Sequence, residues 1–74
     1  MVWDFDRAQL AQRLKKARKD AGLTQMQLAE MTGVHGNTVF NLEHGKQLPG
    51  ADTLAEICKC TGADPAWLLG LKNS

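Results

Sequence analysis

The sequence predicts an all-α domain of five short helices. Glycine interrupts the chain at near-regular intervals, each time after a segment with helical spacing of apolar residues, as expected just past a helix end. These glycines are Gly22, Gly33, Gly45, Gly62 and Gly70. Capping boxes at Asp6 to Gln9 and Thr24 to Gln27 mark two helix starts. Because the chain is 43% hydrophobic but only 5% aromatic, its core must be mainly aliphatic. A chain of 74 residues is then one domain, residues 1–74.

The first helix is expected over residues 6–21, with Phe5 and Leu10 placed as a hydrophobic staple. Its inward face contains Leu10, Leu14, Ala17 and Ala21. Its basic residues, mostly turned away from that face, are Arg13, Lys15, Lys16 and Lys19. The simplest interpretation of these cations is a solvated face.

The next two helices are expected over residues 24–32 and 36–44. Their inward residues are Leu28 and Ala29 in the first, and Val39 and Leu42 in the second. Ala29 is small enough for two helices to touch closely at a steep angle, and Gly33 supplies the left-handed backbone of the turn between them. This pattern predicts a helix-turn-helix.

A fourth helix is expected over residues 51–61, with either Gly50 or Asp52 as its cap. Its inward face contains Leu54, Ile57 and Cys58, with Thr61 as a further candidate. Asp64 as cap and Pro65 at the first helical position then predict a short fifth helix.

Several classes of protein and site are disfavoured by the sequence. No apolar run approaches the ~20 residues of a membrane helix, and the N-terminus has acids where a signal peptide has basic residues. We therefore expect a cytoplasmic protein that does not contact a membrane.

Cys58 and Cys60 are two residues apart on a helix, so their side chains diverge by roughly 200°, and reduced thiols are expected rather than a disulfide or a metal site. No set of side chains typical of a catalytic site is evident, so we expect that the protein is not an enzyme and that it binds no cofactor and no small-molecule substrate.

Three segments carry a family resemblance that spans nearly the whole chain: "RLKKARKDAGLTQMQLAE", "NLEHGKQLP" and "TGADPAWLLG". They resemble the lambda-repressor-like helix-turn-helix family, in particular the N-terminal domains of lambdoid phage repressors. The resemblance implies a compact five-helix domain with its helix-turn-helix at the second and third helices. It also implies a homodimer that binds a palindromic operator in double-stranded DNA, with the 36–44 helix in the major groove.

The resemblance further implies that Gln25 donates to a backbone phosphate and braces the 36–44 helix, and that Arg18 and Glu43 form a partly buried ion pair between the first and third helices. The residues themselves support the pair. Glu43 lies on the inner side of its helix beside Leu42, where a carboxylate needs a partner, and Arg18 lies next to the inner face of the first helix. Direct contact of Arg18 with DNA is the alternative.

The outward face of the 36–44 helix is the expected reading surface. On a helical wheel Asn37, Asn41 and His44 lie within about 60° of one another, opposite Val39 and Leu42. A carboxamide can pair with N6 and N7 of adenine, and an imidazole suits a phosphate or a guanine. The expected base-reading residues are His35, Asn37 and Asn41. The expected phosphate contacts are Gln25, Thr38, His44 and Lys46.

The net charge of +1 is too small to indicate a nucleic-acid partner, but the distribution of charge is informative. Between residues 31 and 50 the only acid is Glu43, which is expected to point inward. The outward face there is therefore expected to be non-acidic.

Two residues depart from the family pattern. Gly36 stands where many relatives have Gln or Arg, so one base is expected to be read weakly or not at all unless His35 or Asn37 compensates. Phe40 stands where small or polar residues are usual. It is expected either to press on a thymine methyl or sugar, or to cover a neighbouring apolar edge.

Near the C-terminus, Trp67 is expected to close the core. In similar repressors this region forms the two-fold contact, so Leu68 and Leu71 are the expected dimer contacts.

The function expected is therefore that of a sequence-specific transcriptional regulator, a repressor of phage or prophage type. One alternative is an antitoxin or a restriction-modification controller of the same fold. The other is a protein-interaction module that has lost DNA binding, which Gly36 and the exposed positions of Met26 and Met31 would allow.

Overall fold

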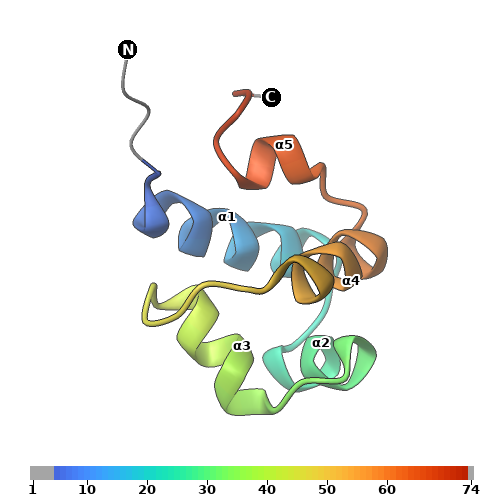
Figure 1. Ribbon diagram of the computed structural model, residues 1–74. Coiled ribbons are helices and arrows are strands. Elements are labelled where there is room, and N and C mark those ends of the chain that lie inside the picture. Colours follow the sequence, from blue (N-terminus) through green and yellow to red (C-terminus); the bar gives the residue numbers. More distant parts are fainter. Residues whose placement is uncertain (1–4, 74) are drawn as a thin grey trace.

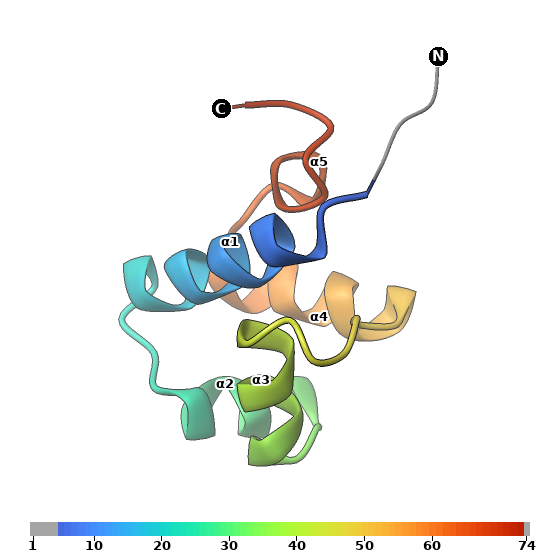
Figure 2. The same ribbon diagram turned by 90° about the vertical axis from the view of Figure 1, so that its left-hand side faces the viewer.

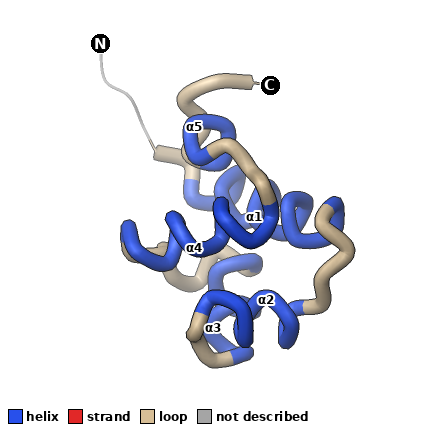
Figure 3. The backbone as a smooth tube through the Cα atoms, turned by 90° about the vertical axis from the view of Figure 1, so that its right-hand side faces the viewer, coloured by secondary structure: helices blue, strands red, loops and turns tan. Residues whose placement is uncertain are grey.

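The computed structural model describes residues 5–73, which form five α-helices joined by short loops (Figure 1). They are α1 (Arg7–Asp20), α2 (Gln25–Thr32), α3 (Gly36–Glu43), α4 (Ala51–Thr61) and α5 (Pro65–Leu68). Within this described range there is no strand (Figure 3). The predicted all-α class is confirmed, and the first four helices agree with their predicted ranges to within one residue at each end.

The helix ends follow the capping chemistry of the sequence. Thr24 and Gln27 form a complete capping box at α2, whereas at α1 the Oδ1 of Asp6 accepts from the backbone N–H of Gln9 at 3.0 Å. All five interrupting glycines have positive φ. At Gly33, where φ is 75°, this backbone lets α2 end and the chain turn directly into α3. Gly50 is the N-cap of α4, which decides between the two predicted caps.

The helix-turn-helix pair lies on one side of α1, and α5 lies on the other (Figures 1 and 2). One buried cluster joins α1 to α3, α4 and α5 and consists of Leu10, Leu14, Ala17, Leu42, Ile57 and Leu68. A second cluster, Leu28, Ala29 and Val39, lies between α2 and α3. Because both α2 and α3 contribute to it, the pair packs as a unit. Ala21, predicted inward, is exposed because α1 ends at Asp20.

The C-terminal segment requires a correction. Leu68 is fully buried, at 0% exposure, so it is a core residue, and the prediction that it forms a dimer contact is wrong. Its side chain packs with the large core cluster, whereas Leu71 is 62% exposed. Trp67 is half-buried against the same cluster, as expected of a residue that closes the core.

Arg13 has a structural role that its position among surface cations did not indicate. Its guanidinium lies 4.9 Å from the centre of the Trp67 ring, and its Nη1 donates to the carbonyl of Trp67 and, at 3.2 Å, to that of Lys72. Lys72 in turn contacts Asp64, and this contact together with the backbone N–H of Ala66 holds the pKa of the Asp64 carboxyl below its usual range. Arg13 thus fastens the C-terminal segment to α1.

The described helices include none long and apolar enough to cross a membrane. Cys58 and Cys60 are free, half-buried thiols, and burial raises the pKa of the Cys58 thiol. No cluster of metal-ligating side chains occurs among residues 5–73.

Candidate nucleic-acid interface

The outward face of α3 carries the two asparagines that the sequence placed there. Asn37 is exposed, and Asn41, one turn further along, is half-buried with its Nδ2 donating to Oε1 of Gln47 at 3.4 Å. The opposite side of the helix is fixed in the core by Val39 and Leu42, each 2% exposed. Burial of that side therefore orients both carboxamides outward.

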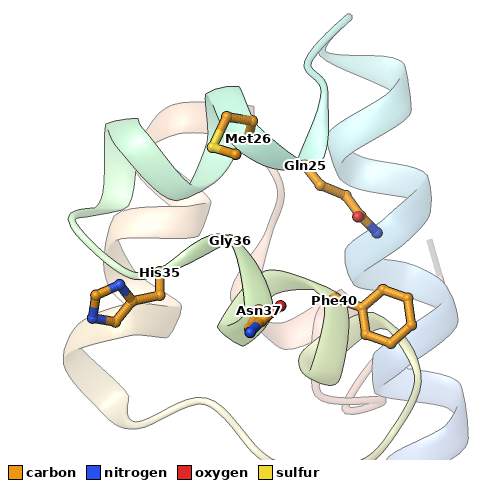
Figure 4. A pocket seen from close by; sticks show the side chains of 6 residues that line it. All are labelled: Gln25, Met26, His35, Gly36, Asn37 and Phe40. Carbon is orange, nitrogen blue, oxygen red and sulfur yellow. The ribbon is translucent and has the colours of Figure 1, made fainter.

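The N-terminal end of α3 presents two polar side chains around a residue that has none. His35 is the N-cap and is exposed, and its side chain makes no capping hydrogen bond. Gly36 is the first residue of the helix, and Thr38 is half-buried. Figure 4 shows the N-cap His35, Asn37 of α3, and Gln25 and Met26 of α2 around Gly36.

Gly36 does not have the positive φ of the five interrupting glycines. A Cβ built on it would lie 3.6 Å from Cε of Met26, which is an ordinary van der Waals distance. The backbone at this position therefore accepts a side chain. Glycine is not required by the backbone here, and its effect is to leave the surface at the start of α3 without a side chain.

Aromatic and basic groups gather at the C-terminal end of α3. The rings of Phe40 and His44 stack with their centres 3.9 Å apart, and Nζ of Lys46 lies 5.5 Å from the centre of the Phe40 ring. Nδ1 of His44 lies 2.8 Å from the carbonyl oxygen of Phe40. Since a carbonyl only accepts, Nδ1 carries the proton in this bond, and Nε2 is the ring nitrogen left for another partner. Phe40 thus covers the imidazole of His44, the C-cap of its helix, while 40% of the Phe40 surface is exposed.

Arg18 and Glu43 lie together in the interior, between α1 and α3. Nε of Arg18 donates to Oε2 of Glu43 at 2.7 Å, Nη2 donates to Oε1 at 3.0 Å, and the side chains are only 9% and 1% exposed. Nη1 of Arg18 donates to the carbonyl of Leu23 at 2.8 Å. The pair is more deeply buried than expected, and its hydrogen bonds offset the cost of removing two charges from water.

Gln25 joins this pair and so braces α3 from the start of α2, in agreement with the bracing role that the family resemblance implied. Its Nε2 donates to Oε1 of Glu43 at 3.1 Å, so α1, α2 and α3 meet in one hydrogen-bonded network. A carboxamide has two N–H donors, and this bond leaves one of them for a phosphate. The particular hydrogen bond was not predictable, because no spacing rule in the sequence links residues on two helices across a turn.

The site is therefore a polar, weakly basic surface on α3 and the loop that follows it. Glu43, the one acid between residues 31 and 50, has its carboxylate inside the network, and Lys46 and His44 lie at the end of α3. A surface of this kind can approach phosphates without an acidic side chain repelling them.

These features define a five-helix, lambda-repressor-like helix-turn-helix domain. A family model described as helix-turn-helix matches residues 14–68, and the chain belongs to this family.

Known proteins similar to the chain agree with this assignment. The HTH-type transcriptional regulator ImmR of Bacillus subtilis is 36% identical over 61 residues, which are 82% of this chain and 48% of ImmR. The chain thus spans about half the length of that relative.

Two solved structures show the same fold. The restriction-modification controller protein C.AhdI of Aeromonas hydrophila superposes with a TM-score of 0.78 at 25% identity, covering 85% of this chain and 96% of that protein. The P22 c2 repressor, solved in complex with a synthetic operator, superposes with a TM-score of 0.76 at 25% identity, covering 81% and 91%.

Proposed function

We propose that the chain is the sequence-specific DNA-binding domain of a transcriptional regulator of repressor type, and that α3 enters the major groove of a palindromic operator. The observation that carries the proposal is the rigid outward display of Asn37 and Asn41. Their carboxamides can each pair with both N6 and N7 of an adenine, and the helix beneath them is fixed by buried contacts.

The contacts proposed to fix the helix on the duplex surround these two asparagines. His35 is the third proposed base-reading residue, because it is exposed at the N-terminal end of α3. The proposed phosphate contacts are Gln25, Thr38, His44 and Lys46. Phosphate contacts set position and register, whereas base contacts set the sequence.

We further propose that two copies bind together through Leu71, which is 62% exposed on the C-terminal segment that Arg13 fastens to α1. In such a dimer the two copies of α3 would enter successive major grooves, about 34 Å apart.

A restriction-modification controller is the second candidate. It is favoured by the similarity to C.AhdI, nearly all of whose chain is covered by this single domain. Both candidates require the same contacts with DNA, so the gene beside this one distinguishes them: a methylase or nuclease gene favours the controller.

Gel-shift titration at about 50 and 200 mM salt tests whether the domain binds DNA at all, because each phosphate contact releases counterions and makes affinity fall as salt rises. For wild type we expect a steep fall. For Lys46→Ala we expect weaker binding to every sequence and a slope shallower by about 1. Absence of binding at the lower salt would favour the protein-interaction alternative, for which Met26 and Met31 are exposed.

A further inference from the structure

The groove between the starts of α2 and α3 contains an apolar side chain that the proposed function does not use. The groove is lined by Gln25, Met26, His35, Gly36, Asn37 and Phe40 (Figure 4). Met26, from the first turn of α2, is 61% exposed although it is a large hydrophobic residue. Its position beside the expected reading surface calls for a physical explanation.

The Met26 side chain lies beside Gly36, next to the space that a side chain at position 36 would enter. A Cβ on Gly36 would lie 3.6 Å from Cε and 3.9 Å from Sδ of Met26. The end of the Met26 side chain therefore lies directly against the bare backbone at the start of α3. The result is a small apolar surface between the exposed polar side chains of His35 and Asn37.

We propose that Met26 determines specificity by contacting the 5-methyl group of a thymine at the base position that Gly36 cannot read. This inference rests on the proposed function. The thymine methyl is the apolar group that a base pair presents in the major groove, so it is the chemical match for a thioether methyl flanked by polar side chains. Methionine is also flexible and polarizable, and it adjusts its shape to such a contact.

The test uses the operator obtained by selection with the wild-type domain. Each thymine is replaced in turn by deoxyuridine, which removes only the methyl group. At one position per half-site we expect wild-type binding to weaken about fourfold, the factor for losing one buried methyl group. In Met26→Ala this penalty should disappear, while penalties at other positions stay as they are.

Met31→Ala is the matched control, because Met31 is also an exposed methionine of α2, at 50%, but does not line the groove. It should retain the full wild-type set of deoxyuridine penalties. Thermal melting of both variants checks that neither change disturbs the fold.

The outcomes separate this inference from the proposed function. Specific binding with no deoxyuridine-sensitive position, or with a penalty that persists in Met26→Ala, would overturn the role of Met26 and leave the proposed function intact. If no sequence is selected at all, the proposed function fails and the inference fails with it.

Discussion

Gly36 begins α3 in an ordinary helical conformation, and the space beside it admits a side chain. Gly36→Gln should therefore be tolerated, and it should raise the free energy of unfolding by up to about 1 kcal/mol because glycine is a poor helix former. The new carboxamide should also create a preference for adenine at one position per half-site. Thermal melting and a repeated operator selection measure the two effects. Unfolding of the variant would mean that the backbone needs glycine here.

Asn37 and Asn41 differ from Lys46 in what they are expected to recognise. Asn37→Ala or Asn41→Ala should each lose about 1 to 3 kcal/mol of binding to the selected operator, with binding to random DNA nearly unchanged. Fluorescence anisotropy with both duplexes provides the comparison. Equal losses on the two duplexes would show that the carboxamides do not read bases.

At the scale of helices, the network of Arg18, Glu43 and Gln25 holds α1, α2 and α3 together. Glu43→Ala should destabilise the fold by about 3 to 5 kcal/mol, because it leaves the Arg18 charge buried without its partner. Replacing Arg18 and Glu43 together with apolar residues should recover much of this loss. Chemical denaturation measures both variants, and a Glu43→Ala stability equal to wild type would contradict the importance of this network.

The helices themselves were largely predictable from the sequence, because caps and positive-φ glycines act over three or four residues. By local chemistry Thr24 and Pro65 mark the starts of α2 and α5, and Gly33 marks the C-terminal end of α2. The outward face of α3 was predictable for a similar reason, since Val39 and Leu42 fix which side is inward.

Contacts between distant segments were not predictable in this way. Three consecutive apolar residues, Trp67, Leu68 and Leu69, give no periodicity that says which one enters the core. Only the resemblance to repressors assigned Leu68 to the dimer contact, and its burial shows that this assignment is wrong. The contact of Arg13 with Trp67 joins positions 54 residues apart. The bond between Gln25 and Glu43 likewise depends on how α2 and α3 pack.

At the scale of the whole molecule, α1 separates the helix-turn-helix from α5 (Figure 1). The proposed dimer contact at Leu71 can therefore be changed without touching α3. Leu71→Asp should shift the protein toward monomer in sedimentation and weaken operator binding about 100-fold, because the second half-site is no longer bound in the same encounter. Met31→Gln is the control, because it also replaces an exposed apolar residue by a polar one but lies in α2, away from the C-terminal segment. A Leu71→Asp protein that remains as dimeric as wild type would place the contact on another surface.

Selection of bound duplexes from a random pool is the most direct test of the claim that α3 reads bases from a two-fold assembly. The predicted result for the wild-type domain is one enriched sequence with two inverted half-sites whose centres lie about 34 Å apart. With Asn37→Ala or Asn41→Ala, the information at the corresponding adenine positions should disappear while the spacing persists. Enrichment of no sequence, or of the same sequence by wild type and both variants, would contradict the claim.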